Sequence, residues 1–151
     1  MAEDNNKKKI VHGYLPDEET YTVTLNAGKH ELMGDEPESV KGGKDKGPDP
    51  YDYLLMALGS CTLMTVKMYA RHKEWPVEDL YVELRHNKRH DEDCENCDDP
   101  KSRIDFIEKE LIVEGDLSQE QIDRLLEISN RCPVNRTLLG DINIEGSITH
   151  K

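Results

Sequence analysis

Residues 49–62 read Asp-Pro-Tyr-Asp-Tyr-Leu-Leu-Met-Ala-Leu-Gly-Ser-Cys-Thr and begin a long apolar segment of the chain. Asp49 can cap a helix, and Pro50 suits the first helical position because its nitrogen has no hydrogen to leave unpaired. Pro76 stops the helix. The sequence therefore predicts a helix that begins at Pro50 and packs one apolar face in the core. The residues expected on this buried face are Leu54, Leu58, Cys61, Met64, Thr65 and Met68.

Alternating apolar and polar residues predict strands on both sides of this helix. The expected strands are 19–25, 29–33 (returning from a turn at 26–28), 77–85 and 104–113, with a final edge strand around Ile142, Ile144 and Ile148. A capping-box pattern at Ser118 and Gln121 opens a second helix, which Pro133 ends. Its expected core face is Ile122, Leu125, Leu126 and Ser129. Because helices and strands occur in blocks, we predict one α+β domain spanning residues 1–151.

Composition and charge exclude several classes of protein. The net charge of −12 argues against nucleic-acid or anionic-membrane partners. The basic run at 7–9 follows two acidic residues, so residues 1–9 are expected to be a flexible, solvated tail. The sequence offers no secretion signal and no apolar stretch of about 18 residues, so we expect no membrane span. Four cysteines in such a chain favour a cytoplasmic protein with catalytic, metal-binding or simply buried thiols.

Two of the cysteines lie at helical positions that suit peroxide chemistry. Cys61 lies within the apolar helix, beside small residues, and Cys132 follows 71 residues later at the end of the second helix. In such a pair, the first sulfur is oxidised and the second resolves it. A single helical cysteine is more often a space-filling core residue, so the sequence around both thiols has to distinguish the two interpretations.

That sequence resembles a known family. Residues 49–62, followed by Asn-Arg-Cys-Pro-Val-Asn-Arg-Thr-Leu at 130–138, resemble the OsmC/Ohr family of thiol-dependent hydroperoxide reductases. The resemblance runs from about the first strand to the C-terminus. It implies an OsmC-like α+β fold, with antiparallel sheets around a long central helix that bears a cysteine. It also implies an intertwined homodimer with the active site at the subunit interface.

The resemblance further implies a mechanism and its partners. Cys61 would be the peroxidatic thiolate, and Cys132 would resolve its sulfenic acid to a disulfide. A dithiol reductant, either a lipoyl protein or a small thiol, would then open the disulfide, and no cofactor is required. Leu and Met around Cys61 would favour organic hydroperoxides over hydrogen peroxide, because an apolar pocket gains from burying an alkyl chain.

The chain departs from the family at the cation that supports the thiolate. The family uses an arginine from the N-terminal region, held by a glutamate just after the proline that starts the helix. Here no arginine precedes Arg71, and Tyr51 and Asp52 follow the proline. Asp52 either orients a cation or caps the helix. Arg131 or Arg136, close to Cys132 in sequence, is a candidate replacement, although both also suit a helix C-terminus.

A second pair of cysteines lies in a charged insertion at residues 86–101. Cys94 and Cys97 form a Cys-x-x-Cys, and with His86 and His90 they would complete the four ligands of a zinc site. Six carboxylates between residues 91 and 99 would attract a divalent cation and disfavour a reactive thiolate pair. The other interpretation is a plain flexible insertion.

Two functions are therefore compatible with the sequence. The first is a thiol-dependent peroxidase that acts through Cys61 and Cys132. The second is a non-catalytic relative that binds a small apolar ligand near Cys61, or a metal at the Cys94/Cys97 loop.

Overall fold

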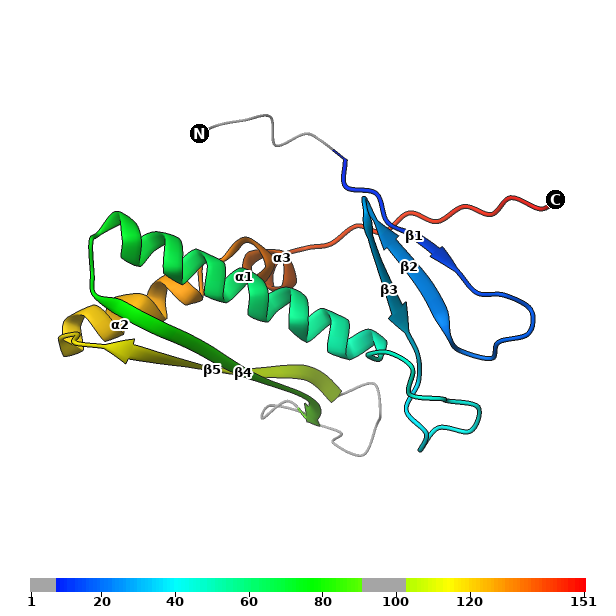
Figure 1. The fold of residues 1–151 in the computed structure, drawn as a ribbon, viewed down its shortest axis with the longest axis horizontal. Coiled ribbons are helices and arrows are strands. Elements are labelled where there is room, and N and C mark those ends of the chain that lie inside the picture. Colours follow the sequence, from blue (N-terminus) through cyan, green and yellow to red (C-terminus); the bar gives the residue numbers. More distant parts are fainter. Residues whose placement is uncertain (1–7, 91–102) are drawn as a thin grey trace. The chain divides into compact units, whose positions relative to one another are not determined.

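The computed structural model describes residues 8–90 and 103–151. The chain forms two compact units, Met1–Leu54 and Leu55–Lys151, and each unit has its own antiparallel sheet. Figure 1 shows the elements of both units in chain order.

The first unit contains a three-stranded sheet in the order β1 (His12–Tyr14), β2 (Val23–Ala27), β3 (His30–Gly34). Ala27 pairs with His30 across a tight turn, where Gly28 has a φ of 61°. Glycine adopts this left-handed conformation without the steric cost that a side chain would add. The predicted hairpin is thus confirmed, but its first strand begins at Val23 instead of Glu19.

A buried carboxylate organises the loop that follows β3. Asp35 is only 3% exposed and accepts hydrogen bonds from Thr22 Oγ1 (2.8 Å) and from the backbone nitrogens of Glu36 (2.8 Å) and Lys46 (3.3 Å). Burial alone would raise the pKa of Asp35, but these hydrogen bonds outweigh it and hold the pKa below its ordinary value. The carboxylate therefore ties the loop to the start of β2.

Helix α1 (Pro50–His72) begins where the sequence predicts and ends at His72, before the expected stop at Pro76. Asp49 accepts from the amide of Asp52, and Asp52 accepts in return from the amide of Asp49, at 2.8 and 3.1 Å. This reciprocal pair satisfies two amide groups at the start of the helix. Length and composition would also let α1 cross a bilayer, although the core helix of a soluble protein meets the same criteria.

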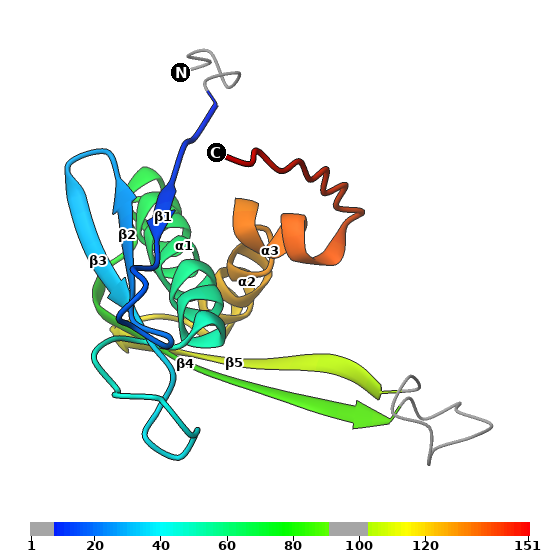
Figure 2. The ribbon, with the colours of Figure 1, turned by 90° about the vertical axis from the view of Figure 1, so that its right-hand side faces the viewer.

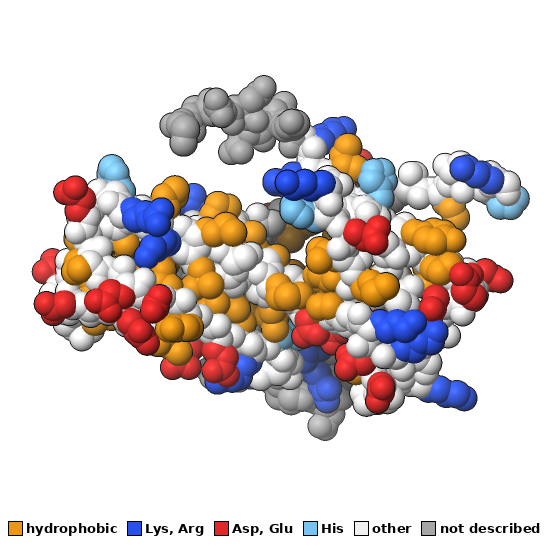
Figure 3. Space-filling view, in the orientation of Figure 1, with side chains coloured by type: hydrophobic (Ala, Val, Ile, Leu, Met, Phe, Trp, Pro, Cys, Tyr) orange, Lys and Arg blue, Asp and Glu red, His pale blue; other side chains and the backbone are white. Residues whose placement is uncertain are grey.

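The predicted buried face of α1 is partly wrong. The buried residues are Leu58, Gly59, Thr62, Val66 and Ala70. Met64 and Met68 are 71% and 69% exposed, and Cys61 is half-buried. The observed core stripe is rotated around the helix relative to the predicted one and consists mostly of small and β-branched residues. Figure 3 shows apolar side chains on the molecular face that carries α1.

A long hairpin underlies α1 in the second unit. Strand β4 (Val77–His90) pairs antiparallel with β5 (Arg103–Gly115), and Leu84 lies opposite Lys109. Both strands are longer than predicted, since β4 continues to His90. The first five residues of the expected 86–101 insertion therefore belong to a strand, and residues 91–102 lie outside the described part of the chain.

Two shorter helices complete this unit. Helix α2 (Gln119–Ser129) has the predicted capping box between Ser118 and Gln121, but it ends at Ser129, before the predicted stop at Pro133. Helix α3 (Pro133–Leu139) starts at that proline. Figures 1 and 2 show α1 and α2 on the same side of the β4–β5 hairpin. Val66, Ala70 and Leu125 form the buried cluster of this layer, and side chains of the hairpin pack against it.

The predicted core face of α2 is confirmed for Leu125 and Ser129, which are fully buried. It is wrong for Ile122 and Leu126, which are largely exposed, while Ile128 is buried instead.

The expected final strand does not form. Residues 141–151, all of which the structure describes, have no helical or strand hydrogen bonding, and Ile142, Ile144 and Ile148 are exposed. Their alternation meets the sequence criterion for a strand, but among the described residues of the second unit no strand pairs with them.

Candidate functional site

Cys132 lies in the junction between α2 and α3. Its side chain is fully buried, and Sγ accepts a hydrogen bond from the amide of Asn135, 3.4 Å away, as the N-cap of α3. The sulfur also lies 3.7 Å from Oγ1 of Thr62, which is fully buried on α1. The second thiol of the predicted pair is thus held against the helix that carries the first.

Cys61 immediately precedes Thr62 on α1 and is half-buried. Both Cys61 and Cys132 are free thiols. The helix can approach the hairpin near Cys61 because Gly59 has no side chain. A Cβ at this position would lie 2.8 Å from the Leu84 side chain and 3.4 Å from that of Val82.

Lys109 joins the elements around the two thiols. Its side chain rises from β5, and Nζ donates to the carbonyl of Ser129 (2.8 Å), Oδ1 of Asn135 (3.3 Å) and Oγ1 of Thr62 (3.5 Å). These acceptors belong to α2, α3 and α1 respectively. One ammonium group therefore contacts the two residues, Thr62 and Asn135, that also contact Cys132 Sγ.

The ammonium group also interacts electrostatically with both thiols. Partial burial lowers the pKa of Lys109 below its ordinary value, because the charged form loses water. Negative charge on Cys132, and to a lesser extent on Cys61, acts in the opposite direction. Both sulfur atoms thus lie within electrostatic range of the same cation.

Sequence reasoning missed Lys109, although the strand pattern contained a signal. Ile107, Lys109, Leu111 and Val113 alternate along β5 and are half-buried, whereas the residues between them are exposed. Side chains two residues apart on a strand share one face. A lysine in an otherwise apolar row therefore marks a position where a charge faces the core.

The three residues that the sequence suggested as supports for the thiolate are all exposed in the structure. Asp52 is exposed in the N-terminal capping box of α1, so the capping interpretation is the one observed. Arg131 and Arg136 are both exposed, and within residues 8–90 and 103–151 neither guanidinium bonds to the Cys132 sulfur.

The predicted metal ligands are not brought together in the described residues. Cys94 and Cys97 lie outside them, and His86 Nε2 lies 2.8 Å from Oδ1 of Asp105 across the hairpin. In the rest of the described chain, no three His, Cys, Asp or Glu side chains are grouped as a metal site would require. The zinc hypothesis stays a prediction.

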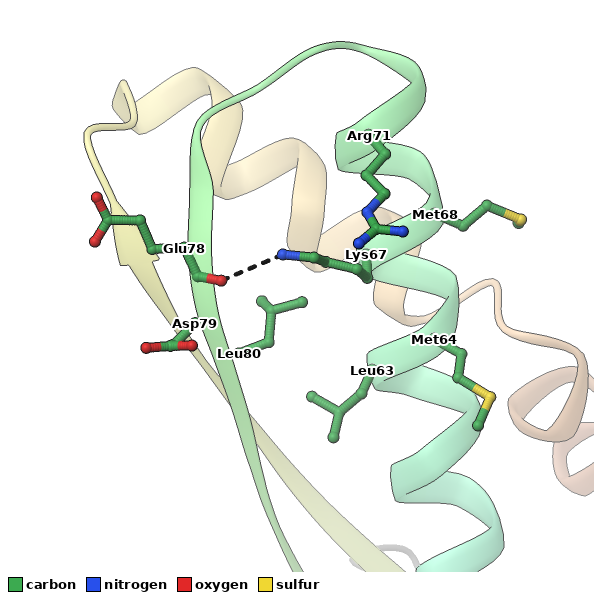
Figure 4. A pocket seen from close by; sticks show the side chains of 8 residues that line it. All are labelled: Leu63, Met64, Lys67, Met68, Arg71, Glu78, Asp79 and Leu80. Carbon is green, nitrogen blue, oxygen red and sulfur yellow. Dashed lines mark hydrogen bonds between the residues drawn. The ribbon is translucent and has the colours of Figure 1, made fainter.

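An open pocket of about 600 Å³ is lined by residues of α1 and of the first part of β4. Figure 4 shows Leu63 and Leu80 facing each other across it, with Lys67 donating to the backbone carbonyl of Glu78 at 3.2 Å. Cys61 and Cys132, both described by the structure, do not line this pocket. It is therefore not the cavity expected next to the thiol pair.

Comparisons with solved structures identify the fold. An OsmC-like protein from Mycoplasma pneumoniae has a TM-score of 0.69 and 21% identity, and the match covers 96% of this chain and 99% of that one. An organic hydroperoxide resistance protein OsmC from Legionella pneumophila has a TM-score of 0.65 and 14% identity, with coverages of 91% and 93%. An organic hydroperoxide resistance protein from Elizabethkingia anophelis has a TM-score of 0.65 and 14% identity, with coverages of 89% and 90%.

At these identities the likeness shows the fold alone, a mixed α/β OsmC-like fold with antiparallel sheets and a long helix. No curated protein matches the chain. The family model described as OsmC-like protein matches residues 43–147, which include both thiols, Thr62 and Lys109. The chain therefore belongs to the OsmC-like protein family.

Proposed function

We propose that this protein is a thiol-dependent peroxidase that reduces organic hydroperoxides through Cys61 and Cys132. One observation carries the proposal. The buried Cys132 sulfur contacts Thr62, the residue next to Cys61, and charges on both sulfurs act on the ammonium group of Lys109. Two free thiols that share one cation suit a reaction in which a thiolate is formed and then oxidised.

The reaction balances with the two thiols and one peroxide. The Cys61 thiolate attacks the distal oxygen of the hydroperoxide, a sulfur–oxygen bond forms, and the oxygen–oxygen bond breaks. The alkoxide takes up a proton and leaves as an alcohol. Cys132, as a thiolate, then attacks the sulfenic sulfur, and hydroxide leaves and is protonated to water. The thiol pair has then lost two electrons in becoming a disulfide, and the peroxide has gained them in becoming alcohol and water.

An external dithiol completes the cycle. A lipoyl protein or a small dithiol returns two electrons by thiol–disulfide exchange and is itself oxidised to a disulfide. The cycle needs no metal or organic cofactor. A cytoplasmic location suits it, because a reducing compartment regenerates the thiols.

A homodimer is part of this proposal. Large apolar side chains of the second unit are exposed, which favours a partner surface. They include Met64, Met68, Tyr81, Ile112, Leu126 and Leu139. The Leu and Met residues that surround Cys61 in the sequence favour alkyl hydroperoxides over hydrogen peroxide as substrates.

The test is a measurement of intact mass and free thiols after anaerobic reduction and addition of one equivalent of cumene hydroperoxide. Hydrogen peroxide is run alongside, with Cys61→Ser and Cys132→Ser as controls. We expect two thiols to be lost rapidly as one Cys61–Cys132 disulfide, and faster with the organic peroxide. The Cys132→Ser variant should stop at a sulfenic acid on Cys61, which dimedone traps.

Persistence of both thiols would overturn the peroxidase proposal. A protein that binds a small apolar ligand near Cys61, without turnover, would then be the better description.

A further inference from the structure

We propose that Lys109 is a positioning residue that holds the Cys61–Cys132 pair in its thiolate form, with its ammonium group fixed by Thr62, Ser129 and Asn135. It would supply from strand β5 the positive charge that the family resemblance assigns to an N-terminal arginine. The peroxidase role of that thiolate rests on the function proposed above, but the charge relationship itself does not.

The geometry fixes the ammonium group without neutralising it. A lysine ammonium group has three hydrogens, and Lys109 directs its hydrogen bonds at three neutral oxygens at 2.8, 3.3 and 3.5 Å. The side chain is half-buried. Among the described residues, no carboxylate forms an ion pair with it. A partly desolvated charge without a counter-charge is unfavourable, and a thiolate nearby would relieve it.

The carboxylates closest in sequence are directed elsewhere. Glu108 and Glu110 flank Lys109 on β5 but lie on its exposed face, and Glu108 bonds to Arg89. Leu84 lies opposite Lys109 on β4, and the neighbours of Leu84, Glu83 and Arg85, are exposed and bond to each other.

The ionisable groups that interact with the Lys109 ammonium group are the two thiols. Cys61 and Thr62 come from α1, and Cys132 comes from the α2–α3 junction, whose Arg131 and Arg136 are exposed. The opposing effects on the Lys109 pKa agree with this arrangement, because burial lowers it while charge on Cys132 and Cys61 raises it. The interaction is reciprocal: if thiolates stabilise the protonated form of Lys109, then protonated Lys109 stabilises the thiolates by the same free energy.

Two variants separate charge from packing. Lys109→Gln keeps a donor for the carbonyl of Ser129 but removes the charge, and Lys109→Arg keeps the charge. The matched control is Lys67→Gln, because Lys67 is also half-buried and donates to two backbone carbonyls, those of Val77 and Glu78. The readout is the rate of iodoacetamide alkylation of each cysteine as a function of pH, resolved by peptide mass spectrometry.

For Lys109→Gln we expect alkylation of Cys61 or Cys132 near neutral pH to slow roughly tenfold, with its midpoint about one pH unit higher. Lys109→Arg should restore most of the rate, and Lys67→Gln should match the wild type. An unchanged midpoint in a folded Lys109→Gln protein would overturn the inference and leave Lys109 as a packing residue.

A second measurement covers the case in which Lys109→Gln does not fold. The Lys109 side chain is followed by carbon NMR through a pH titration, with the thiols free and with both blocked as neutral methyl disulfides. The pKa of Lys109 should fall when the thiols are blocked, and an unchanged titration would overturn the inference.

The two proposals fail in different ways. Peroxide-resistant thiols in the wild type, together with a Lys109-dependent alkylation midpoint, would refute the peroxidase and retain the cation. Rapid peroxide oxidation at equal rates in the wild type and Lys109→Gln would support the peroxidase and refute the role of Lys109.

Discussion

Oγ1 of Thr62 lies 3.7 Å from Sγ of Cys132, although 70 residues of sequence separate them. Because Thr62 follows Cys61 directly, this contact brings the C-terminal thiol motif to the cysteine helix. The same hydroxyl also accepts from Lys109 at 3.5 Å, so one buried oxygen lies between the cation and the second thiol.

Thr62→Val should therefore slow the resolving step. Valine has nearly the same shape, but it removes the hydroxyl that is available to a Cys132 thiolate. We expect disulfide formation to slow by roughly tenfold, the effect of about one charged hydrogen bond, while the first oxidation of Cys61 changes less. When peroxide reactions are quenched with dimedone, Thr62→Val should show more trapped sulfenic acid than the wild type. Equal sulfenic acid in both proteins would contradict the role of the hydroxyl.

Leu125→Ala should destabilise the layer that positions Cys132. Leu125 is fully buried against Val66 and Ala70, so its removal leaves a cavity between α2 and α1. We expect a loss of about 2–5 kcal/mol in the free energy of unfolding, measured with urea. The exposed Leu126 next to it gives the matched control, and Leu126→Ala should cost much less. Similar losses in both variants would mean that α2 faces the core differently.

Gly115→Ala should destabilise the end of the hairpin. Gly115 has a φ of 142°, and a Cβ there would lie 2.2 Å from the carbonyl oxygen of Pro76. Both the conformation and the close approach exclude a side chain, so we expect a loss of about 1–3 kcal/mol or more. Gly146→Ala is the control, because a Cβ there meets open space. Thermal unfolding followed by circular dichroism compares the two variants.

Asp35→Asn should make the first unit less stable at neutral pH, but not in acid. The folded-state pKa of Asp35 is lowered, so its carboxylate contributes stability above its unfolded pKa and loses it as the pH falls through the folded value. We expect the melting temperature of the variant to be a few degrees lower at about pH 7 and to approach that of the wild type in strong acid, where the Asp35 carboxyl is protonated in both the folded and the unfolded state. A difference that persists unchanged in acid would exclude ionisation as the cause.

The proposed homodimer predicts a concentration-dependent mass. Light scattering should give twice the chain mass, and Met64→Glu/Met68→Glu should lower it, because two exposed methionines one turn apart would become charged. Ile148→Glu is the control, since Ile148 is 95% exposed in the C-terminal segment. A monomer in the wild type at all concentrations would refute the dimer.

The sequence predicted the elements that have local signals. Proline and aspartate at the start of α1, the capping box at Ser118 and the glycine in the β2–β3 turn act within a few residues, and each is found where expected. The proximity of Cys132 to α1 was expected only through the family resemblance, since chain separation alone imposes no distance.

The errors came from interactions between distant residues. Helical spacing placed Met64 and Met68 in the core, but the hairpin packs against the small-residue stripe that includes Gly59 and Thr62. Alternation at Ile142, Ile144 and Ile148 predicted a strand without showing a partner for it. Lys109 was not predicted because it is distant in sequence from both cysteines, and only the packing of β5 against α1, α2 and α3 brings it near them.

The register of the hairpin has a consequence for how the chain can change in length. Lys109 faces inward because it lies in the half-buried row of β5, between Ile107 and Leu111. It pairs with Leu84 on β4. Deleting one residue within β5 would turn Lys109 to solvent and bring a glutamate to the thiols in its place. Residues added between His90 and Arg103 leave this pairing unchanged. Length variation should therefore be tolerated between the strands and selected against within them, so the Cys94/Cys97 segment can diverge without disturbing the thiol pair.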